Sequence, residues 1–345
     1  MRLNLIPHNK PTMSDMEAQA ALTVIKEGRL MTGETVTLFE EKLGEMHGVD
    51  PRLVLAAGSG SAALVLSLLG LGVEGKKVAV PNYCCSSLEQ AVYLAGATPV
   101  FYDVKKGDVN WMLPFRNHFD FLIYPHLFGI PSEVPEELSE ITIEDCSQAI
   151  GSKVNSRYVG TQTKISTFSF YATKLLTTGG QGGAVICKDD NVADYLRDYL
   201  DYDSKNDSKR RFNHRMSDLQ AAIGIVQLER LMNEFIPARE QIFLRYLDLG
   251  LDLIGSSADA SIEPVRFRTI AKLRSRAERD ALLDRLCSRG VSAIVPIKDS
   301  EILGGKTDNS VGARVNANLF LSLPCYPSLS SADLEYICET ARMSF

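Results

Sequence analysis

Residues 166–190 read STFSFYATKLLTTGGQGGAVICKDD. Lys174 lies in this stretch between an aromatic-rich run and a Gly-rich loop. The runs at 166–170 and 183–187 have the apolar character of core strands. A lysine at the end of such a strand should have its ammonium form disfavoured by desolvation, which makes the amine a better nucleophile. An exposed lysine at a turn is the commoner alternative for a lysine taken at random.

Apolar strand-like runs and helix-like segments alternate over most of the chain. Capping boxes at 14–17 and 217–220 predict helix starts,. The expected strands include 76–83, 98–104, 120–126, 140–145, 166–170 and 183–187. Strands that alternate with helices favour an α/β fold, with a mostly parallel sheet covered by helices on both faces.

The alternation weakens near Ile236 and Pro237. Beyond this point the sequence predicts strands near 264–270 and 291–295, and helices near 276–289 and at the C-terminal end. We therefore predict a large α/β domain over residues 1–235 and a smaller α+β domain over residues 236–345. A length of 345 residues is in keeping with two domains,.

Composition narrows the class of protein. Apolar residues make up 45% of the chain, and the net charge of −6 comes with no basic stripe, which argues against nucleic-acid binding,. The seven cysteines show no pairing pattern, and the histidines lack metal-ligand spacing, so we expect reduced thiols and no metal,. The sequence has no signal-peptide core and no membrane-length apolar run, and we therefore expect a cytoplasmic location.

In open α/β sheets, ligands bind beyond the carboxyl ends of the strands. Four polar features fall where strands should end: the turn at 58–61, Asp145, Ser169 and Lys174. The Gly/Ser turn at 58–61 precedes a helix and could bind an anion; Asp145 ends an apolar strand, with Gln148 three residues later; and Ser169 precedes Lys174,. Each feature alone also has a purely structural explanation. Together they fit pyridoxal 5'-phosphate (PLP), which needs a lysine for its aldehyde, a carboxylate for its ring nitrogen and an anion site for its phosphate.

The sequence resembles the DegT/DnrJ/EryC1/StrS sugar aminotransferases, which are fold-type I PLP-dependent enzymes. The resemblance rests on SGSAALVLSLLGLG, EDCSQAIG, STFSFYATKLLTTGGQGGAVI and FNHRMSDLQAAIGIVQLERL. It implies that Lys174 bonds to the cofactor and then shuttles a proton, and that Asp145 pairs with the ring nitrogen. It further implies a homodimer with shared active sites and a set of other cofactor-binding residues: Gly60, Ser61, Ala62, Cys85, Gln148, Ser169 and Asn213, the last acting from the neighbouring subunit.

The sequence departs from the family pattern at two places. Cys85 stands where the family has an aromatic residue stacked on the cofactor ring; either Tyr83 compensates or the ring packs on the Cys85 sulfur. Residues 292–305 read SAIVPIKDSEILGG and lack the histidines of the family's substrate loop. These departures leave the identity of the substrate more open than that of the cofactor.

The resemblance implies transfer of an amino group from L-glutamate or glutamine to a keto group, with a nucleotide-linked keto-sugar as the expected acceptor. During turnover the cofactor would pass through its pyridoxamine phosphate form. A PLP-binding protein with a regulatory role or a non-sugar substrate remains the main alternative. A pyridoxamine-dependent dehydratase would have histidine in place of Lys174, and only the 58–61 turn supports a nicotinamide-linked oxidoreductase.

Overall fold

The computed structural model describes residues 5–109, 118–256, 259–305 and 310–342. Its main feature is a seven-stranded sheet with the strand order β1-β9-β8-β5-β4-β2-β3. The bounds of these strands are β1 (Val54–Ala57), β2 (Lys77–Pro81), β3 (Thr98–Tyr102), β4 (Phe121–Pro125), β5 (Thr142–Asp145), β8 (Ile165–Ser169) and β9 (Gly183–Cys187). Strands β3, β2, β4, β5 and β8 pair in parallel, which confirms the predicted α/β class.

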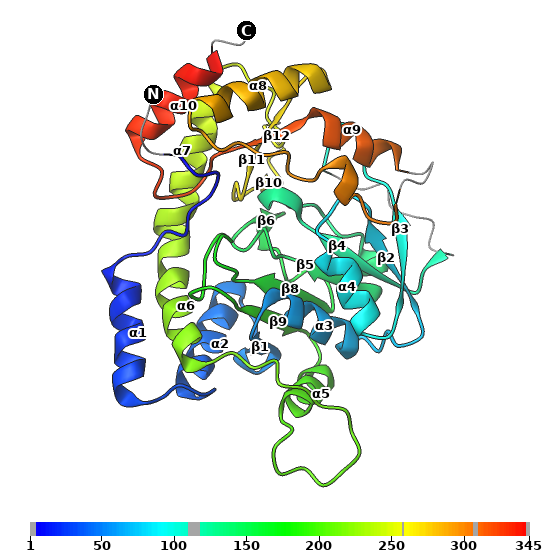
Figure 1. Cartoon of the computed structure of the whole chain (residues 1–345). Coiled ribbons are helices and arrows are strands. Elements are labelled where there is room, and N and C mark those ends of the chain that lie inside the picture. Colours follow the sequence, from blue (N-terminus) through cyan, green and yellow to red (C-terminus); the bar gives the residue numbers. More distant parts are fainter. Residues whose placement is uncertain (1–4, 110–117, 257–258, 306–309, 343–345) are drawn as a thin grey trace.

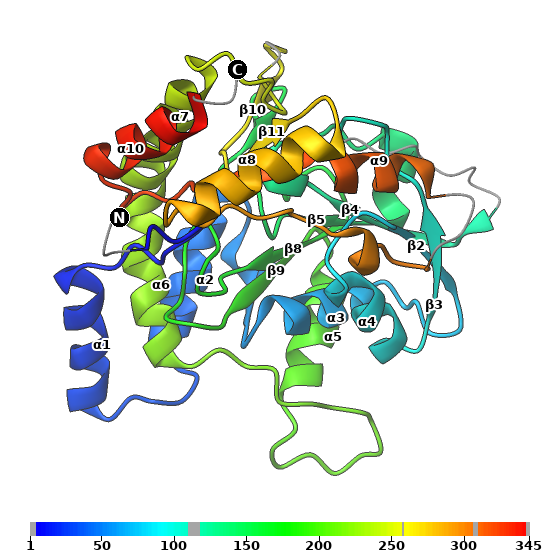
Figure 2. The same ribbon diagram turned by 45° about the horizontal axis from the view of Figure 1, so that its top comes forward.

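Helices cover both faces of this sheet (Figures 1 and 2). The side chains of α3 (Gly60–Gly70), α4 (Ser87–Leu94) and α5 (Asp190–Leu200) pack in one apolar cluster with the sheet. Those of α2 (Glu34–His47) and α6 (Asp218–Arg230) pack in a second cluster on the opposite face. Alternate residues of β1 face these two clusters, as expected for a strand buried on both sides,.

Both predicted capping boxes are present. Ser14 and Glu17 start α1 (Asp15–Glu27), and Ser217 and Gln220 start α6. Helix α6 continues through a π-helical turn (Leu231–Phe235) into α7 (Ile236–Leu247), and the three form one long helical run in Figure 1. The predicted domain boundary at 235/236 falls inside this run, and the division itself stays a prediction.

The C-terminal part, from residue 259 onward, lies over the ends of the strands of the large sheet (Figure 1). It contains β11 (Thr269–Lys272) paired with β12 (Phe320–Leu323), and α8 (Arg276–Ser288), α9 (Val311–Leu319) and α10 (Ser331–Arg342). The expected strand at 291–295 is reduced to two isolated bridges, because Val291 pairs with Ile6 and Ile294 with Ser322.

Short elements complete the described fold. A small sheet joins β6 (Lys153–Val154), β7 (Arg157–Tyr158) and β10 (Ile262–Glu263). Short 3-10 helices cover Pro51–Leu53, Leu127–Gly129, Glu136–Ile141 and Asp299–Glu301. Within the described ranges, no helix combines the length and the apolar character that crossing a membrane requires.

Candidate functional site

Most of the predicted site residues lie together at the carboxyl ends of the strands of the large sheet. Strand β9 runs antiparallel to both β1 and β8, and Gly183 is the partner of Ala57 on one side and of Ser169 on the other. The carboxyl end of β1 therefore lies on the same side of the sheet as the carboxyl ends of β8 and β5. A cavity of about 960 Å³ opens there, between the sheet and the C-terminal part. Its size is in the range of small-molecule sites.

Lys174 lines this cavity five residues after the end of β8. Its loop is closed by backbone hydrogen bonds from Ala172 N–H to the Gly180 carbonyl and from Phe170 N–H to the Gly182 carbonyl. Burial lowers the pKa of the Lys174 amine, and although Asp145 opposes this effect, the net direction is downward. The lowered pKa gives the amine the nucleophilic character that the sequence predicts.

Backbone conformation and close packing explain why this loop contains glycine at several positions. Gly179, Gly180 and Gly182 have φ angles of 86°, 146° and 158°, in the region that favours glycine,. A Cβ on Gly182 would also overlap the Oγ1 of Thr178. The loop that carries Lys174 can therefore stay compact only with glycine at its far side.

The start of α3 forms the wall of the cavity beside Ser169. Ser59 caps the helix by accepting a hydrogen bond from Ala62 N–H at 3.1 Å, and Ala62 itself does not line the cavity. Gly60 and Ser61 do line it. The first N–H groups of a helix have no acceptor within the helix, and together with the helix dipole they favour an anion.

Asp145 ends β5 and is buried, as its place in the sequence predicts. One carboxylate oxygen accepts a hydrogen bond from Ser147 N–H at 2.9 Å. Gln148 accepts a hydrogen bond from Phe128 N–H at 2.8 Å through Oε1. Both side chains line the cavity together with Lys174.

Cys85 also lines the cavity, at the position where the family pattern has an aromatic ring. Of the two alternatives, compensation by Tyr83 is wrong, and packing of the cofactor ring on the Cys85 sulfur stays a prediction. The Tyr83 ring is fully buried and packs edge-on against Phe320, with ring centroids 6.2 Å apart, and the described structure gives its hydroxyl no hydrogen-bond partner. In a strand-to-helix connection, residues two apart need not share an environment, and here Cys85 lines the cavity whereas Tyr83 does not.

Asn213 lies outside the cavity of its own chain. Its side chain is exposed, and Oδ1 accepts a hydrogen bond from Arg215 N–H at 3.3 Å. Arg215 anchors this segment through a 2.6 Å ion pair with Asp201. A contact of Asn213 with the cofactor of a neighbouring subunit stays a prediction.

Among the cavity residues that sequence reasoning missed are Phe267 and Arg268, which come from the C-terminal part. Lys174 Nζ lies 5.2 Å from the centroid of the Phe267 ring, and Arg268 Cζ lies 5.6 Å from the same centroid. The only sequence signal was an arginine that interrupts the apolar run before β11. Nothing local connects that arginine to Lys174, which is 94 positions away along the chain.

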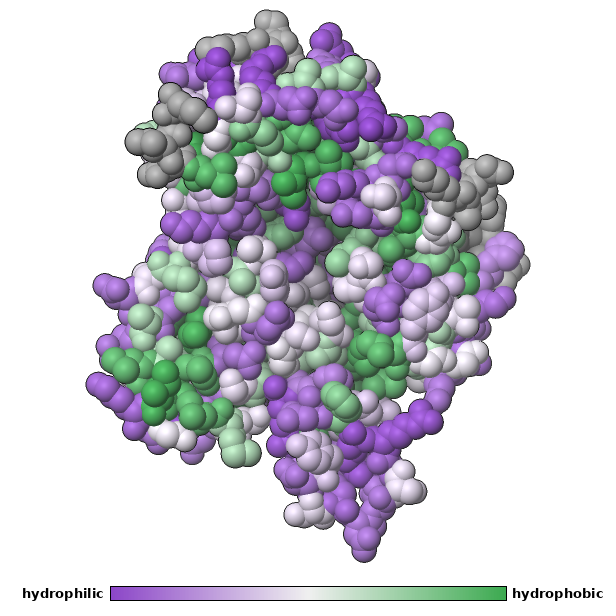
Figure 3. All heavy atoms as spheres, viewed as in Figure 1, coloured by the Kyte–Doolittle hydropathy of each residue, from purple (hydrophilic) through white to green (hydrophobic). Residues whose placement is uncertain are grey.

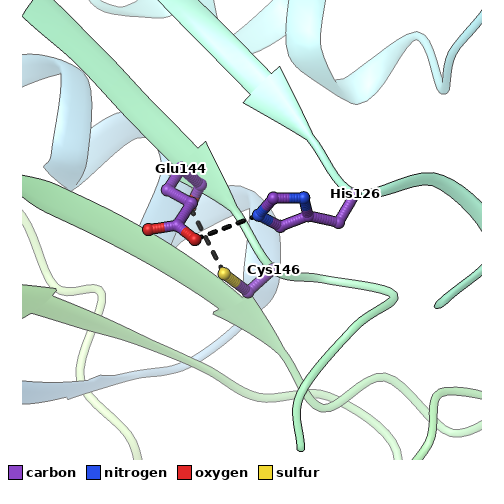
Figure 4. A group of neighbouring side chains, drawn as sticks. All are labelled: His126, Glu144 and Cys146. Atoms are coloured by element: carbon purple, nitrogen blue, oxygen red, sulfur yellow. Dashed lines mark hydrogen bonds and ion pairs between the residues drawn. The ribbon is translucent and has the colours of Figure 1, made fainter. Parts of the chain in front are cut away.

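His126, Glu144 and Cys146 form a buried group beneath the sheet edge with metal-ligating side chains (Figure 4). Glu144 accepts hydrogen bonds from His126 Nε2 at 3.0 Å, Gly160 N–H at 2.7 Å and both nitrogens of Gln162. Burial alone would raise the pKa of Glu144, but these hydrogen bonds outweigh it and lower the pKa. Because protein donors saturate the carboxylate, the group serves to hold the 160–162 turn in place.

The donor set of the cavity fits PLP. Lys174 supplies an amine, Asp145 a buried carboxylate, and the start of α3 an anion site that Ser169 adjoins. A Cβ on Gly60 would lie 2.5 Å from Ser169, so the start of α3 can approach the end of β8 this closely only because residue 60 has no side chain. These are the three kinds of group that the cofactor requires.

Comparisons with known proteins agree with this assignment. The chain is 28% identical to GDP-perosamine synthase of Escherichia coli O157:H7, over 98% of each protein. Its fold matches the aminotransferase TlmJ from Streptoalloteichus hindustanus with a TM-score of 0.90 and 26% identity, over 99% of both chains. Spr1654 from Streptococcus pneumoniae, solved in a PLP form, shares the fold with a TM-score of 0.85 and 21% identity, over 99% of this chain and 98% of that one.

The profile of one family covers residues 11–342, nearly the whole chain and all of the cavity described above. The chain therefore belongs to the DegT/DnrJ/EryC1/StrS aminotransferase family of PLP-dependent enzymes.

Proposed function

We propose that the protein transfers an amino group from L-glutamate, or from glutamine, to the keto group of a nucleotide-linked sugar. The observation that carries this proposal is the convergence of Lys174, Asp145 and the start of α3 on one cavity. The relative named GDP-perosamine synthase supports a nucleotide-sugar acceptor, because the similarity extends over the full length of both chains.

In this proposal each residue has a distinct task. PLP, when bound, supplies the electron sink that stabilises negative charge on the donor's α-carbon. Lys174 holds the cofactor's aldehyde end and moves a proton on and off its Nζ atom, a role that its lowered pKa favours,. Asp145 keeps a proton on the ring nitrogen. The N–H groups of Gly60 and Ser61, with Ser169, hold the phosphate.

The acceptor would lie against the wall formed by the C-terminal part. Pro296, Ile297, Glu301 and Gly304 line this side of the cavity. They belong to the segment 292–305, which departs from the family's substrate loop. We infer that the choice of sugar depends on this wall, while the cofactor contacts lie on the large sheet.

The active unit in this proposal is a homodimer, in a cytoplasmic setting that suits the seven free cysteines,. Apolar side chains gather over α1 at the lower left of Figure 3. Leu22, Ile25 and Met31 are 40%, 53% and 79% exposed, and Met13 and Met16 lie on the same segment. A monomeric protein rarely exposes so many large apolar groups together, so this face is a candidate dimer surface.

The first test separates chemistry from binding. Treatment of the yellow protein with borohydride and peptide mapping should place the label on Lys174, and a label on another lysine would reject this assignment. L-glutamate alone should then bleach the PLP absorbance, because the first half of the transfer needs no acceptor. A stable yellow colour with glutamate and glutamine would favour the binding-only alternative.

The acceptor is found with a panel of nucleotide-linked keto-sugars and glutamate as donor. An aminated product identified by mass spectrometry is the expected result. If glutamate bleaches the enzyme but only a keto compound without a nucleotide restores the colour, the aminotransferase assignment holds and the acceptor class is wrong.

A further inference from the structure

Within the described part of the chain, Arg268 is a cation without a counter-ion at the wall of the cavity. Its Nη1 is buried and has no hydrogen-bond partner. Among the described residues, none forms an ion pair or a hydrogen bond with its guanidinium; only its backbone N–H is engaged, with the Phe128 carbonyl at 3.2 Å. A buried charge left unpaired is costly, and the cost is recovered when an anion binds.

Neighbouring buried arginines show the contrast. Arg266, two residues earlier, donates to Glu240 at 2.8 Å and to the Gly255 carbonyl at 2.8 Å. Arg239 donates to the Cys325 carbonyl at 2.7 Å and to the Phe267 carbonyl at 3.1 Å. Arg239 thereby fixes the backbone beside Arg268 through its Nη1, although its own Nε has no hydrogen-bond partner in the described structure.

The position of Arg268 relative to Lys174 indicates which anion it binds. Lys174 Nζ and Arg268 Cζ lie 5.2 Å and 5.6 Å from the centroid of the same Phe267 ring. In the proposed transfer, the donor carbon that loses its proton lies beside Lys174 Nζ. The α-carboxylate is one bond from that carbon, whereas the side-chain carboxylate of glutamate is three bonds away.

We propose that Arg268 binds the α-carboxylate of the amino donor and thereby selects amino acids over other amines. This inference rests on the proposed function. A guanidinium can hold a carboxylate through two parallel N–H bonds, which fixes its orientation as well as its position. The bound carboxylate would also set the α-carbon hydrogen toward Lys174, so the same contact serves binding and proton transfer.

The cofactor phosphate is a poor alternative ligand, because Gly60 and Ser61 with Ser169 already form an anion site on the large sheet, whereas Arg268 belongs to the C-terminal part. A carboxylate on the acceptor sugar, as in a keto-uronate, is the other source of the same chemistry. The two sources differ in which half of the transfer they affect, and the experiment separates them on that basis.

The test compares wild-type holoenzyme with Arg268→Gln, Arg268→Lys and the control Arg266→Gln. Calorimetric titration with glutarate measures carboxylate binding without any turnover. We expect Arg268→Gln to weaken glutarate binding on the order of 10- to 100-fold, the usual effect of losing a charged hydrogen-bond pair, and Arg268→Lys to weaken it less. Arg266→Gln should lower the melting temperature and leave glutarate binding unchanged.

Half-reactions identify the carboxylate. Bleaching by L-glutamate should slow by a similar factor in Arg268→Gln, while bleaching by 4-aminobutyrate, which lacks the α-carboxylate, should keep its wild-type rate constant. Unchanged glutarate binding with unchanged glutamate kinetics would overturn the inference, as would an effect confined to the acceptor half-reaction. If wild-type enzyme transfers no amino group at all, the proposed function fails, and the glutarate titration still decides whether Arg268 binds carboxylates.

Discussion

Gly60, at the start of α3, packs so tightly against Ser169, at the end of β8, that a Cβ on residue 60 would lie 2.5 Å from both Cβ and Oγ of Ser169. The next strand makes the same approach, because a Cβ on Gly183 would lie 2.5 Å from the Ser59 carbonyl oxygen. The helix start and the two strand ends therefore hold one another in register around the proposed phosphate site.

Gly60→Ala should push the start of α3 away from β8. We expect a destabilisation of about 1–3 kcal/mol, typical of overpacking, together with a higher dissociation constant for PLP. Thermal melting and equilibrium titration of cofactor-free protein measure the two effects. Gly250→Ala is the control, since Gly250 has a φ of 77° but open space around its Cβ position; it should cost stability and leave PLP affinity unchanged. Equal PLP affinity in both variants would place the phosphate elsewhere.

Asp145→Asn should impair turnover far more than cofactor binding. The carboxylate's proposed role is to keep the ring nitrogen protonated, which matters most when negative charge develops on the α-carbon. We expect the rate constant for bleaching by saturating glutamate to fall on the order of 10²-fold or more, as for other losses of a transition-state contact. A rate close to that of the wild type would show that Asp145 only positions Ser147, from whose N–H it accepts a hydrogen bond at 2.9 Å.

Subunit mixing tests whether Asn213 acts across the dimer. Lys174→Ala and Asn213→Asp should each be inactive as homodimers, the first through loss of the amine and the second through a negative charge near the phosphate. If Asn213 serves the partner's cavity, co-expression places both defects in one composite site and leaves the other intact. We expect the purified heterodimer to have about half of the wild-type activity, since two-fold dimers contain two equivalent sites.

Two results would contradict the shared site: a heterodimer as inactive as its parents, or an active monomer in solution scattering. Ile25→Glu is an independent probe of the dimer, because Ile25 is 53% exposed on α1 and a charge there should disfavour an apolar interface. Sedimentation of this variant should show a larger monomer fraction than wild-type protein at the same concentration.

His8 should make the cofactor-free protein sensitive to mild acid. Burial, with the Arg268 and Arg239 guanidinium groups, lowers the pKa of His8 to about 3. The unfolded chain binds this proton below its ordinary pKa of about 6.5, whereas the folded chain does not until the pH reaches about 3. Stability therefore falls as the pH drops through that window.

Urea unfolding at pH 7 and pH 5 measures this contribution. From pH 7 to pH 5, wild-type protein should lose about 2 kcal/mol more than His8→Gln, which keeps a polar group near Ser322 and cannot take up the proton. In the folded protein, His8 Nε2 and Ser322 Oγ are 2.8 Å apart. The same pH dependence in both proteins would assign the acid sensitivity to other groups.

Local sequence patterns were sufficient for most of the large sheet. Both capping boxes start the helices that they predict, and the runs before Lys174 and Asp145 form β8 and β5. These predictions succeed because strand periodicity, helix caps and chain-breaking residues act over a few positions. A polar residue at the end of an apolar strand is a local signal too, so the sequence is enough to propose Lys174 and Asp145.

Other features depend on contacts between distant segments. Arg268 joins the cavity because the C-terminal part lies over the sheet edge, and Tyr83 is withdrawn from it because Phe320 packs on its ring. The apolar side chains of Leu22 and Ile25 on α1 are likewise exposed in the monomer.

The sequence alone therefore determined the strand-and-helix order and the kinds of chemical group at the strand ends, since those follow from neighbouring residues. Only the tertiary structure decided which groups share the cavity and which cation lacks a partner. Whether a buried cation has a partner depends on how distant segments pack. Arg266 and Arg268 are only two positions apart, but Arg266 donates to Glu240, whereas the guanidinium of Arg268 has no acceptor among the described residues.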